Sequence, residues 1–189
     1  MKKITIFLCI AIAFFSCDDS DDDAAIARIE VDGKEINFTK STIVNTQNEA
    51  DTLYRMIFAL HTDGISYDTD VRNFVGEGDL MYSNFTSPVS TGLADGTYTY
   101  DRGNFSNFHF RGGIIGINLN YQSSTYDKRF VFDGGEATFT RNDVEYNFTP
   151  NMKALYLDFE KNTTDPDKFI TISGNFRVKP TFKVSLEKE

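Results

Sequence analysis

The sequence predicts an all-β protein, an antiparallel β-sandwich of roughly ten short strands. Three observations predict this class. From Ile26 onward, apolar residues recur with a period of two, which places alternate side chains on opposite faces of a sheet. Asp-Gly pairs, which favour tight hairpin turns, recur along the chain. No stretch of ten or more residues shows a 3.6-residue apolar period. A lipocalin-like β-barrel is the alternative architecture.

The expected strands follow one another along the chain, with these turns between them. The segments IARIEVDGKEINF and RFVFDGGEATF each predict a hairpin centred on Asp-Gly. Alternation also predicts strands with one apolar face at Tyr54/Met56/Phe58/Leu60, Phe108/Phe110, Ile117/Leu119/Tyr121, Val144/Tyr146/Phe148 and Leu155/Leu157/Phe159. In the last segment, Phe176, Val178, Pro180, Phe182, Val184 and Leu186 are expected to share one face. Pro180 cannot donate to a ladder and therefore predicts a bend or an edge there.

The first residues predict export and attachment to a lipid. Lys2 and Lys3 precede an apolar run of 12 residues, Ile4 to Phe15. This run is shorter than the about 20 residues that span a bilayer, and it fits a signal peptide. Ser16 followed by Cys17 resembles the lipobox of bacterial lipoproteins. That resemblance implies cleavage after residue 16, diacylglycerol on the Cys17 thiol, and a further acyl chain such as palmitate on its amine.

Residues 17–25 consist of this cysteine and the acidic segment that follows it. Its like charges and lack of apolar groups predict an extended, solvated tether. Such a run resembles the surface-export signal of Bacteroidota lipoproteins, which implies an outer-membrane anchor with the protein facing the exterior. A plain spacer is the alternative. The acidic residues are Asp18, Asp19, Asp21, Asp22 and Asp23.

Residues 26–189 are expected to form a single domain. Loss of residues 1–16 leaves 173 residues and changes the net charge from −9 to −11, so nucleic acid is not an expected partner. With Cys9 removed and Cys17 lipidated, neither a disulfide nor a cysteine metal site is expected, and no cofactor is indicated. The phrases ARIEVDGKEINF, LADGTYTYD, EATFTRNDVEYNFTPN and ISGNFRV resemble Bacteroidota surface lipoproteins of unknown function. That resemblance implies no activity.

Few residues suggest catalysis. The chain has two histidines, His61 and His109, and no HExxH or GxSxG motif, so no catalytic residue is assigned. The densest carboxylate group in the domain is Asp68, Asp70, Glu77 and Asp79. These four are weak candidates for calcium, because Arg72 and Asn73 stand where an EF-hand loop needs Asp or Asn and then Gly. Paired loop carboxylates would suit a hydrolase.

Aromatic residues give the better binding hypothesis. Tyrosines next to Asp and Asn can stack on sugar rings and bond their hydroxyls; the candidates are Tyr67, Tyr82, Tyr98, Tyr100, Tyr121 and Tyr126. His109 and Arg111 share an outward face beside Phe110, and we include both with Tyr67, Tyr98 and Tyr100 as candidate ligand-binding residues. Asp51-Thr52-Leu53 resembles the Bacteroidota O-glycosylation motif, which makes Thr52 a candidate for modification.

The sequence therefore predicts a membrane-anchored, non-catalytic module that binds a glycan or an envelope protein partner. The motivation is the lipid anchor, the acidic tether and the lack of a catalytic motif. Two alternatives remain: an envelope hydrolase that uses loop carboxylates, and a structural or adhesin subunit with an open edge strand.

Overall fold

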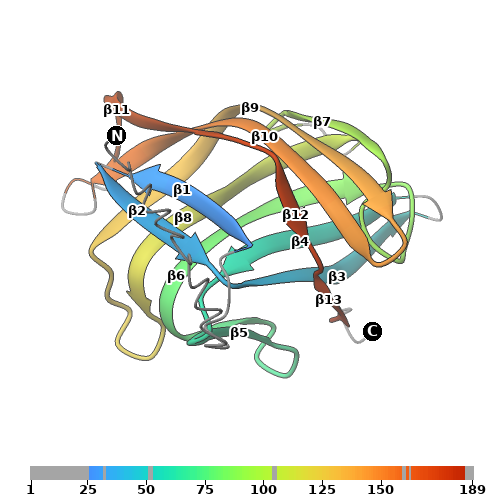
Figure 1. The fold of residues 1–189 in the computed structure, drawn as a ribbon, viewed down its shortest axis with the longest axis horizontal. Helices are drawn as coiled ribbons and strands as arrows, with labels where there is room; N and C mark the ends of the chain where they lie inside the picture. The colour runs from blue at the N-terminus through green and yellow to red at the C-terminus, as the bar shows by residue number, and fades with distance from the viewer. Residues whose placement is uncertain are drawn as a thin grey trace, which may run out of the picture.

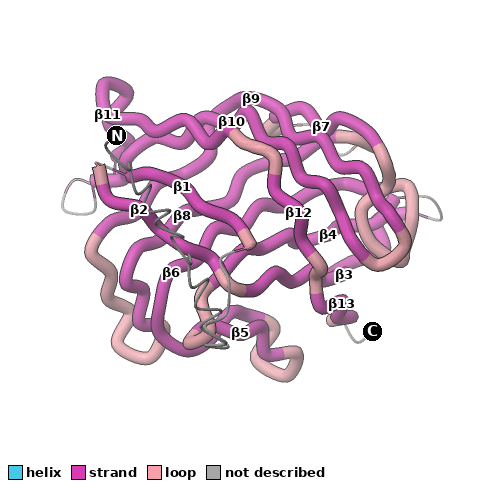
Figure 2. The backbone as a smooth tube through the Cα atoms, viewed as in Figure 1, coloured by secondary structure: helices cyan, strands magenta, loops and turns pink. Residues whose placement is uncertain are grey.

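The computed structural model describes residues 26–31, 33–50, 53–103, 106–158, 161 and 163–185. These residues form thirteen strands, and no helix occurs among them (Figure 2). The strands make two open sheets that are not closed into a barrel, so the predicted all-β, sandwich-like fold is confirmed.

The smaller sheet is the predicted first hairpin. Strand β1 (Ala27–Val31) pairs antiparallel with β2 (Lys34–Phe38), and Gly33 takes the positive φ of +74° that the tight turn requires. In Figure 1 this hairpin lies across one face of the larger sheet. We call the covered face the inner face and the opposite one the outer face.

The larger sheet contains eleven strands, mostly antiparallel. Its strand order is β11-β10-β9-β7-β8-β6-β4-β3-β13, with β5 paired to β6 and β12 paired to β10. The bounds are β3 (Lys40–Ala50), β4 (Leu53–His61), β5 (Ile65–Asp68), β6 (Asn73–Ser87), β7 (Gly96–Tyr100), β8 (His109–Asn120), β9 (Lys128–Asn142), β10 (Glu145–Asp158), β11 (Thr163–Ser173), β12 (Phe176–Val178) and β13 (Thr181–Val184).

Aromatic rings from several strands of the larger sheet pack together on its inner face. Phe139 on β9 lies at the centre, fully buried, and stacks on Phe148 at 4.9 Å between ring centroids. It also meets Phe58, Phe85 and Tyr98 edge-on, at 5.1, 5.3 and 5.7 Å. Offset and edge-on contacts of this kind add to the stabilisation from burial. The β1–β2 hairpin contributes five further buried residues to this cluster: Ala27, Ile29, Val31, Ile36 and Phe38.

The last segment changes its partner at Pro180. Before the proline, β12 pairs antiparallel with β10; after it, β13 pairs parallel with β3 (Figure 1). The predicted bend is therefore present, but the predicted common face is wrong. Val178 is buried, whereas Phe182 and Val184 are 41% and 54% exposed. The alternation ends because the bend breaks the strand before β13 joins its new neighbour.

The prediction of a second hairpin at RFVFDGGEATF is also wrong. Strand β9 runs through this segment without turning, and the register with β10 shifts so that β9 carries one extra residue, Asp133. This is a β-bulge. Gly135 has a φ of +95°, and a Cβ there would stand 2.2 Å from the Asn151 carbonyl oxygen. Gly134 and Gly135 therefore belong to a bulge, and the missing side chain at Gly135 lets β10 lie close to β9.

Removing the central ring should cost more stability than removing an exposed one. We expect Phe139→Ala to lower the free energy of unfolding by about 3–5 kcal/mol, because it leaves a cavity among four rings. The matched control is Phe169→Ala, on a side chain that is 53% exposed, with an expected loss below about 1 kcal/mol. Urea unfolding measures both; equal losses would contradict the central role of Phe139.

Candidate functional site

A second, smaller apolar cluster covers part of the outer face. Strand β5 and the start of β6 fold over this face and bury Ile65, Tyr67 and Phe74 against the sheet. Phe74 stacks on Tyr82 with ring centroids 5.5 Å apart. The remaining buried members are Val44, Ala59, Leu80 and Leu119, with Ile57, Tyr82, Tyr121 and Tyr126 packed around them. This cluster is the floor on which the candidate site is built.

A β-bulge at Asn118 brings the end of β8 to the outer face. Ile117 belongs to the inner cluster and Leu119 to the outer one, so the prediction that these residues share a face is wrong. Asn118 has a φ of +50°, and the register with β6 shifts at this point. The Asp79 carboxylate accepts a hydrogen bond of 2.8 Å from the Asn118 backbone N–H. A shift of one residue moves the following side chains to the other face.

The turn after β8 is fixed by its own hydrogen bonds. Asn120 and Thr125 exchange backbone bonds of 2.8 and 3.2 Å, and the Asn120 side-chain oxygen accepts from the Ser123 N–H at 2.8 Å. The Tyr121 N–H donates to the Gly76 carbonyl of β6 at 3.0 Å. These bonds hold the tyrosines of the turn, Tyr121 and Tyr126, in place over the sheet.

Between this turn and the sheet lies a hollow of about 310 Å³, which we call the tyrosine pocket. Its wall combines aromatic rings with hydrogen-bonding groups: Tyr82, Tyr121, Tyr126, Asn73, Asn120 and Arg129. A wall that mixes aromatic and apolar side chains with hydrogen-bonding groups is typical of small-molecule sites, whose volumes start at about 300 Å³. The structure thus brings together three of the six candidate tyrosines.

The phenols of the pocket are neutral at physiological pH. Burial raises the pKa of Tyr121 to about 12, with nearby Tyr82 adding to the rise and Arg129 opposing it. Burial also raises the pKa values of Tyr82 and Tyr126. A neutral phenol both donates and accepts a hydrogen bond, whereas a phenolate only accepts. The pocket can therefore bond hydroxyl groups in either sense.

A second hollow, of about 380 Å³, adjoins the tyrosine pocket. Asn73 and Tyr121 line both hollows, so the two share a wall. Phe74, Val75 and Val71 make most of the second one apolar, and Glu77 lies at its edge. The Asn120 amide donates a hydrogen bond to the Glu77 carboxylate, which joins the rims of the two hollows.

Arg111, a candidate from the sequence, lies in a third hollow on the outer face. Arg55 of β4, Asn84 of β6, Arg102 after β7 and Arg111 of β8 surround about 230 Å³. We call this the arginine pocket. No local sequence pattern links these positions, and only the pairing of β4, β6, β8 and β7 brings them together.

The other candidate tyrosines are packed in the two clusters. Tyr98 is fully buried at the inner face, where its hydroxyl donates to the Ala94 carbonyl at 3.1 Å, and burial raises its pKa to about 12. Tyr67 is 4% exposed and meets Phe74 edge-on. Tyr100 is half-buried against Phe110. These three rings support the sheet.

His109 lies on the outer face beside Arg111, as the alternation predicts, but its geometry does not suit a general base. Its Nδ1 atom is 2.9 Å from both the Asn107 carbonyl oxygen and the Ser106 hydroxyl. A carbonyl only accepts, so Nδ1 carries the proton and cannot take one from Ser106. A serine activated by histidine would need the opposite arrangement.

The four acidic candidates lie in two places: Asp68 and Asp70 at the end of β5 and in the turn after it, and Glu77 and Asp79 on β6. Asp68 accepts backbone bonds from Asp70 and Val71 at 2.8 and 3.0 Å, and these bonds lower its pKa. Glu77 accepts from Asn120, and Asp79 holds the bulge at Asn118. Among the residues that the structure describes, no three acidic, histidine or cysteine side chains gather as metal ligands.

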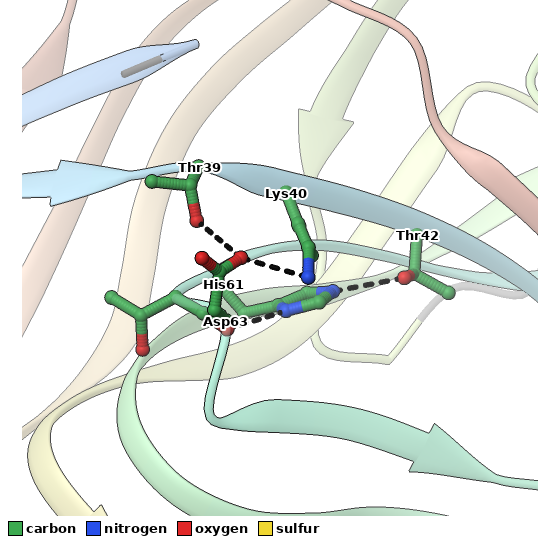
Figure 3. Close-up of polar contacts among 6 residues, drawn as sticks. Thr39, Lys40, Thr42, His61 and Asp63 are labelled. Carbon is green, nitrogen blue, oxygen red and sulfur yellow. Dashed lines mark hydrogen bonds and ion pairs between the residues drawn. The ribbon is translucent and has the colours of Figure 1, made fainter. Parts of the chain in front are cut away.

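His61 is a buried histidine whose bonds are satisfied (Figure 3). Its Nδ1–H donates to the Thr62 carbonyl at 3.0 Å, and Nε2 accepts from the Thr42 hydroxyl at 2.9 Å. Burial is the largest cause of a lowered pKa, and Lys40 adds to it. Next to it, Asp63 binds Lys40 at 2.8 Å and Thr39 at 3.0 Å. The neutral ring therefore joins β3 to β4.

Several candidates from the sequence lie outside the described residues. They are Cys17 and the signal peptide before it, the acidic residues Asp18, Asp19, Asp21, Asp22 and Asp23, and Thr52. Within the described ranges, no helix has the length and apolar character needed to cross a membrane.

Comparison with known proteins finds no matching family model, no similar curated protein and no similar solved structure.

Stability should fall when the pH drops through the titration range of His61. Its folded pKa is lowered, so below about pH 6.5 the unfolded chain binds the proton first and unfolding is favoured. We expect the free energy of unfolding to decline between about pH 7 and pH 5, and this part of the slope to be absent in His61→Gln. Urea titrations across that range measure it. Identical slopes in the two proteins would contradict the assignment.

Proposed function

We propose that this protein is a lipid-anchored, surface-exposed module that binds a carbohydrate without cleaving it. The observation that carries the proposal is the tyrosine pocket. Its three tyrosine rings offer apolar surface for the faces of sugar rings, and Asn73, Asn120 and the neutral phenols offer partners for sugar hydroxyls.

The two adjoining hollows favour an oligosaccharide over a single sugar. The tyrosine pocket and the apolar hollow share Asn73 and Tyr121. A chain that enters one hollow can continue into the other across the Tyr121 ring. The turn that carries Tyr121 is fixed by backbone bonds, so little ordering is required on binding.

The geometry favours binding over hydrolysis. Glycoside cleavage needs two carboxyl groups on either side of the bond, about 5–10 Å apart. Within the described part of the chain, Glu77 is the one carboxylate that lines either hollow, and it is bonded to Asn120. The alternative of an envelope hydrolase has no such pair here.

The sheet edges also argue against an adhesin subunit that accepts a donor strand. The long strand at one end of the sheet, β11, carries Asp165, Pro166, Asp167 and Lys168 in its middle. Charges and proline on an edge strand oppose pairing with another chain. The strand at the other end, β13, has four residues.

The tyrosine pocket is tested by removing one ring. We expect Tyr121→Ala to weaken oligosaccharide binding by more than about tenfold, because this ring borders both hollows. Calorimetry with cello-, xylo-, malto- and mannotetraose provides the measurement. Tyr121→Phe keeps the ring and loses only the hydroxyl, so it should lose much less affinity than Tyr121→Ala, and Phe169→Ala removes an exposed ring outside the pocket. Binding of none of these sugars, or equal binding by Tyr121→Ala, would count against the proposal.

The anchor is tested separately at Cys17. We expect the protein expressed in a Bacteroidota host to lack residues 1–16, to carry acyl chains on Cys17 and to be removed from intact cells by protease. Cys17→Ser should be released from the membrane fraction, because the thiol that takes the lipid is gone. Mass spectrometry of the N-terminal peptide measures the cleavage and the acyl chains on Cys17, and cell fractionation measures the release of Cys17→Ser. An unmodified Cys17 would refute the anchor and leave the tyrosine pocket unaffected.

A further inference from the structure

The arginine pocket is the feature of the outer face that carbohydrate stacking does not explain. Three guanidinium groups surround one hollow in a chain with 19 basic and 28 acidic residues. Arginine presents a planar fork of N–H donors that matches carboxylate, sulfate and phosphate oxygens. The chemistry of the hollow therefore points to an anionic group.

The three arginines come from three different parts of the fold. Arg55 lies on β4, Arg111 on β8, and Arg102 follows β7. The backbone holds the last two together, because the Asp101 N–H donates to the Phe110 carbonyl at 2.9 Å. Asn84 of the intervening strand β6 adds an amide to the same hollow. Paired strands thus fix the backbone positions of Arg55, Asn84 and Arg111 before any ligand binds, which lowers the cost of binding.

The arginine pocket lies beside the tyrosine pocket along β6. Tyr82 lines the tyrosine pocket and Asn84 lines the arginine pocket. Residues two apart on a strand share a face and are separated by about 7 Å. On β8, Ile114 and Arg111 repeat this order, with Ile114 in the tyrosine pocket. A ligand that stacks on the tyrosines can therefore extend an anionic substituent to the arginines.

We infer that the ligand is an acidic oligosaccharide, with sugar rings in the tyrosine pocket and a carboxylate or sulfate group in the arginine pocket. This inference rests on the proposed carbohydrate binding and names its ligand class. Both anions accept hydrogen bonds from guanidinium groups in the same way, so the shared chemistry is a sugar-borne oxyanion. The affinity should fall as salt concentration rises, since exposed charges are screened.

The test uses pairs of ligands that share a sugar backbone, one member carrying the anionic groups and the other neutral. Tetragalacturonate and its full methyl ester share one backbone, and κ-carratetraose and its desulfated form make the sulfate pair. We expect the folded protein to bind at least one acidic member about tenfold or more tighter than its neutral counterpart by calorimetry. The pair that shows the preference identifies the anion as carboxylate or sulfate.

The variants separate the two pockets. Arg55→Gln, Arg102→Gln and Arg111→Gln combined should abolish the preference for the acidic ligand while weak binding of the neutral one remains. Arg102→Gln alone, at an exposed residue, keeps the test available if the triple variant does not fold. The matched control is Arg28→Gln, on the β1–β2 hairpin, where the arginine is 63% exposed. It should keep the preference.

Three results would overturn the inference, and they are distinguishable. Equal affinity for acidic and neutral members would refute the anion site and leave carbohydrate binding intact. A preference that survives the triple substitution would place the anion elsewhere. Binding to phosphatidylglycerol vesicles that depends on the arginines, with no binding of any sugar, would assign the pocket to a lipid phosphate. That last result would refute the proposed function as well.

Discussion

The structure depends on one packing constraint: rings from strands that lie apart in the larger sheet must interlock on its inner face. Phe139 meets rings from β4, β6, β7 and β10, so strands that are distant in the chain are fixed relative to one another by a single buried side chain. Because the side-chain period of a strand is two, the residues next to each member of this cluster point to the outer face, except at bulges. The outer face, with its tyrosine and arginine pockets, is the result of how the inner one is filled.

Local patterns in the sequence predict the fold class and much of the strand pattern. The first hairpin, the buried face of β4 and the outward position of Arg111 all follow from alternation. The errors come from positions where a non-local neighbour decides the local structure. Asp133–Gly134 has the composition of a turn, yet the partner strand β10 continues past it, and the same residues form a bulge. Leu119 likewise changes face because the bulge before it, at Asn118, is held by Asp79, 39 positions before Asn118.

The site shows the same limit. Six tyrosines were comparable candidates in the sequence, and the bulge at Asn118 and the turn after it explain how Tyr121 comes to line a pocket. Tyr67 and Tyr98 have similar neighbours in the chain but fill the two apolar clusters. No sequence pattern identified Arg55 or Arg102 as site residues, because a cluster whose members come from separate strands has no characteristic spacing along the chain.

The β1–β2 hairpin makes a sheet of its own and contributes its side chains to the inner cluster. It is held on the larger sheet chiefly by apolar burial, a force that is mostly entropic near room temperature and weakens on cooling. Ladder bonds within the larger sheet do not share that dependence. Chilling should therefore loosen this lid before the rest of the domain, and the rings beneath it would be the first to meet solvent.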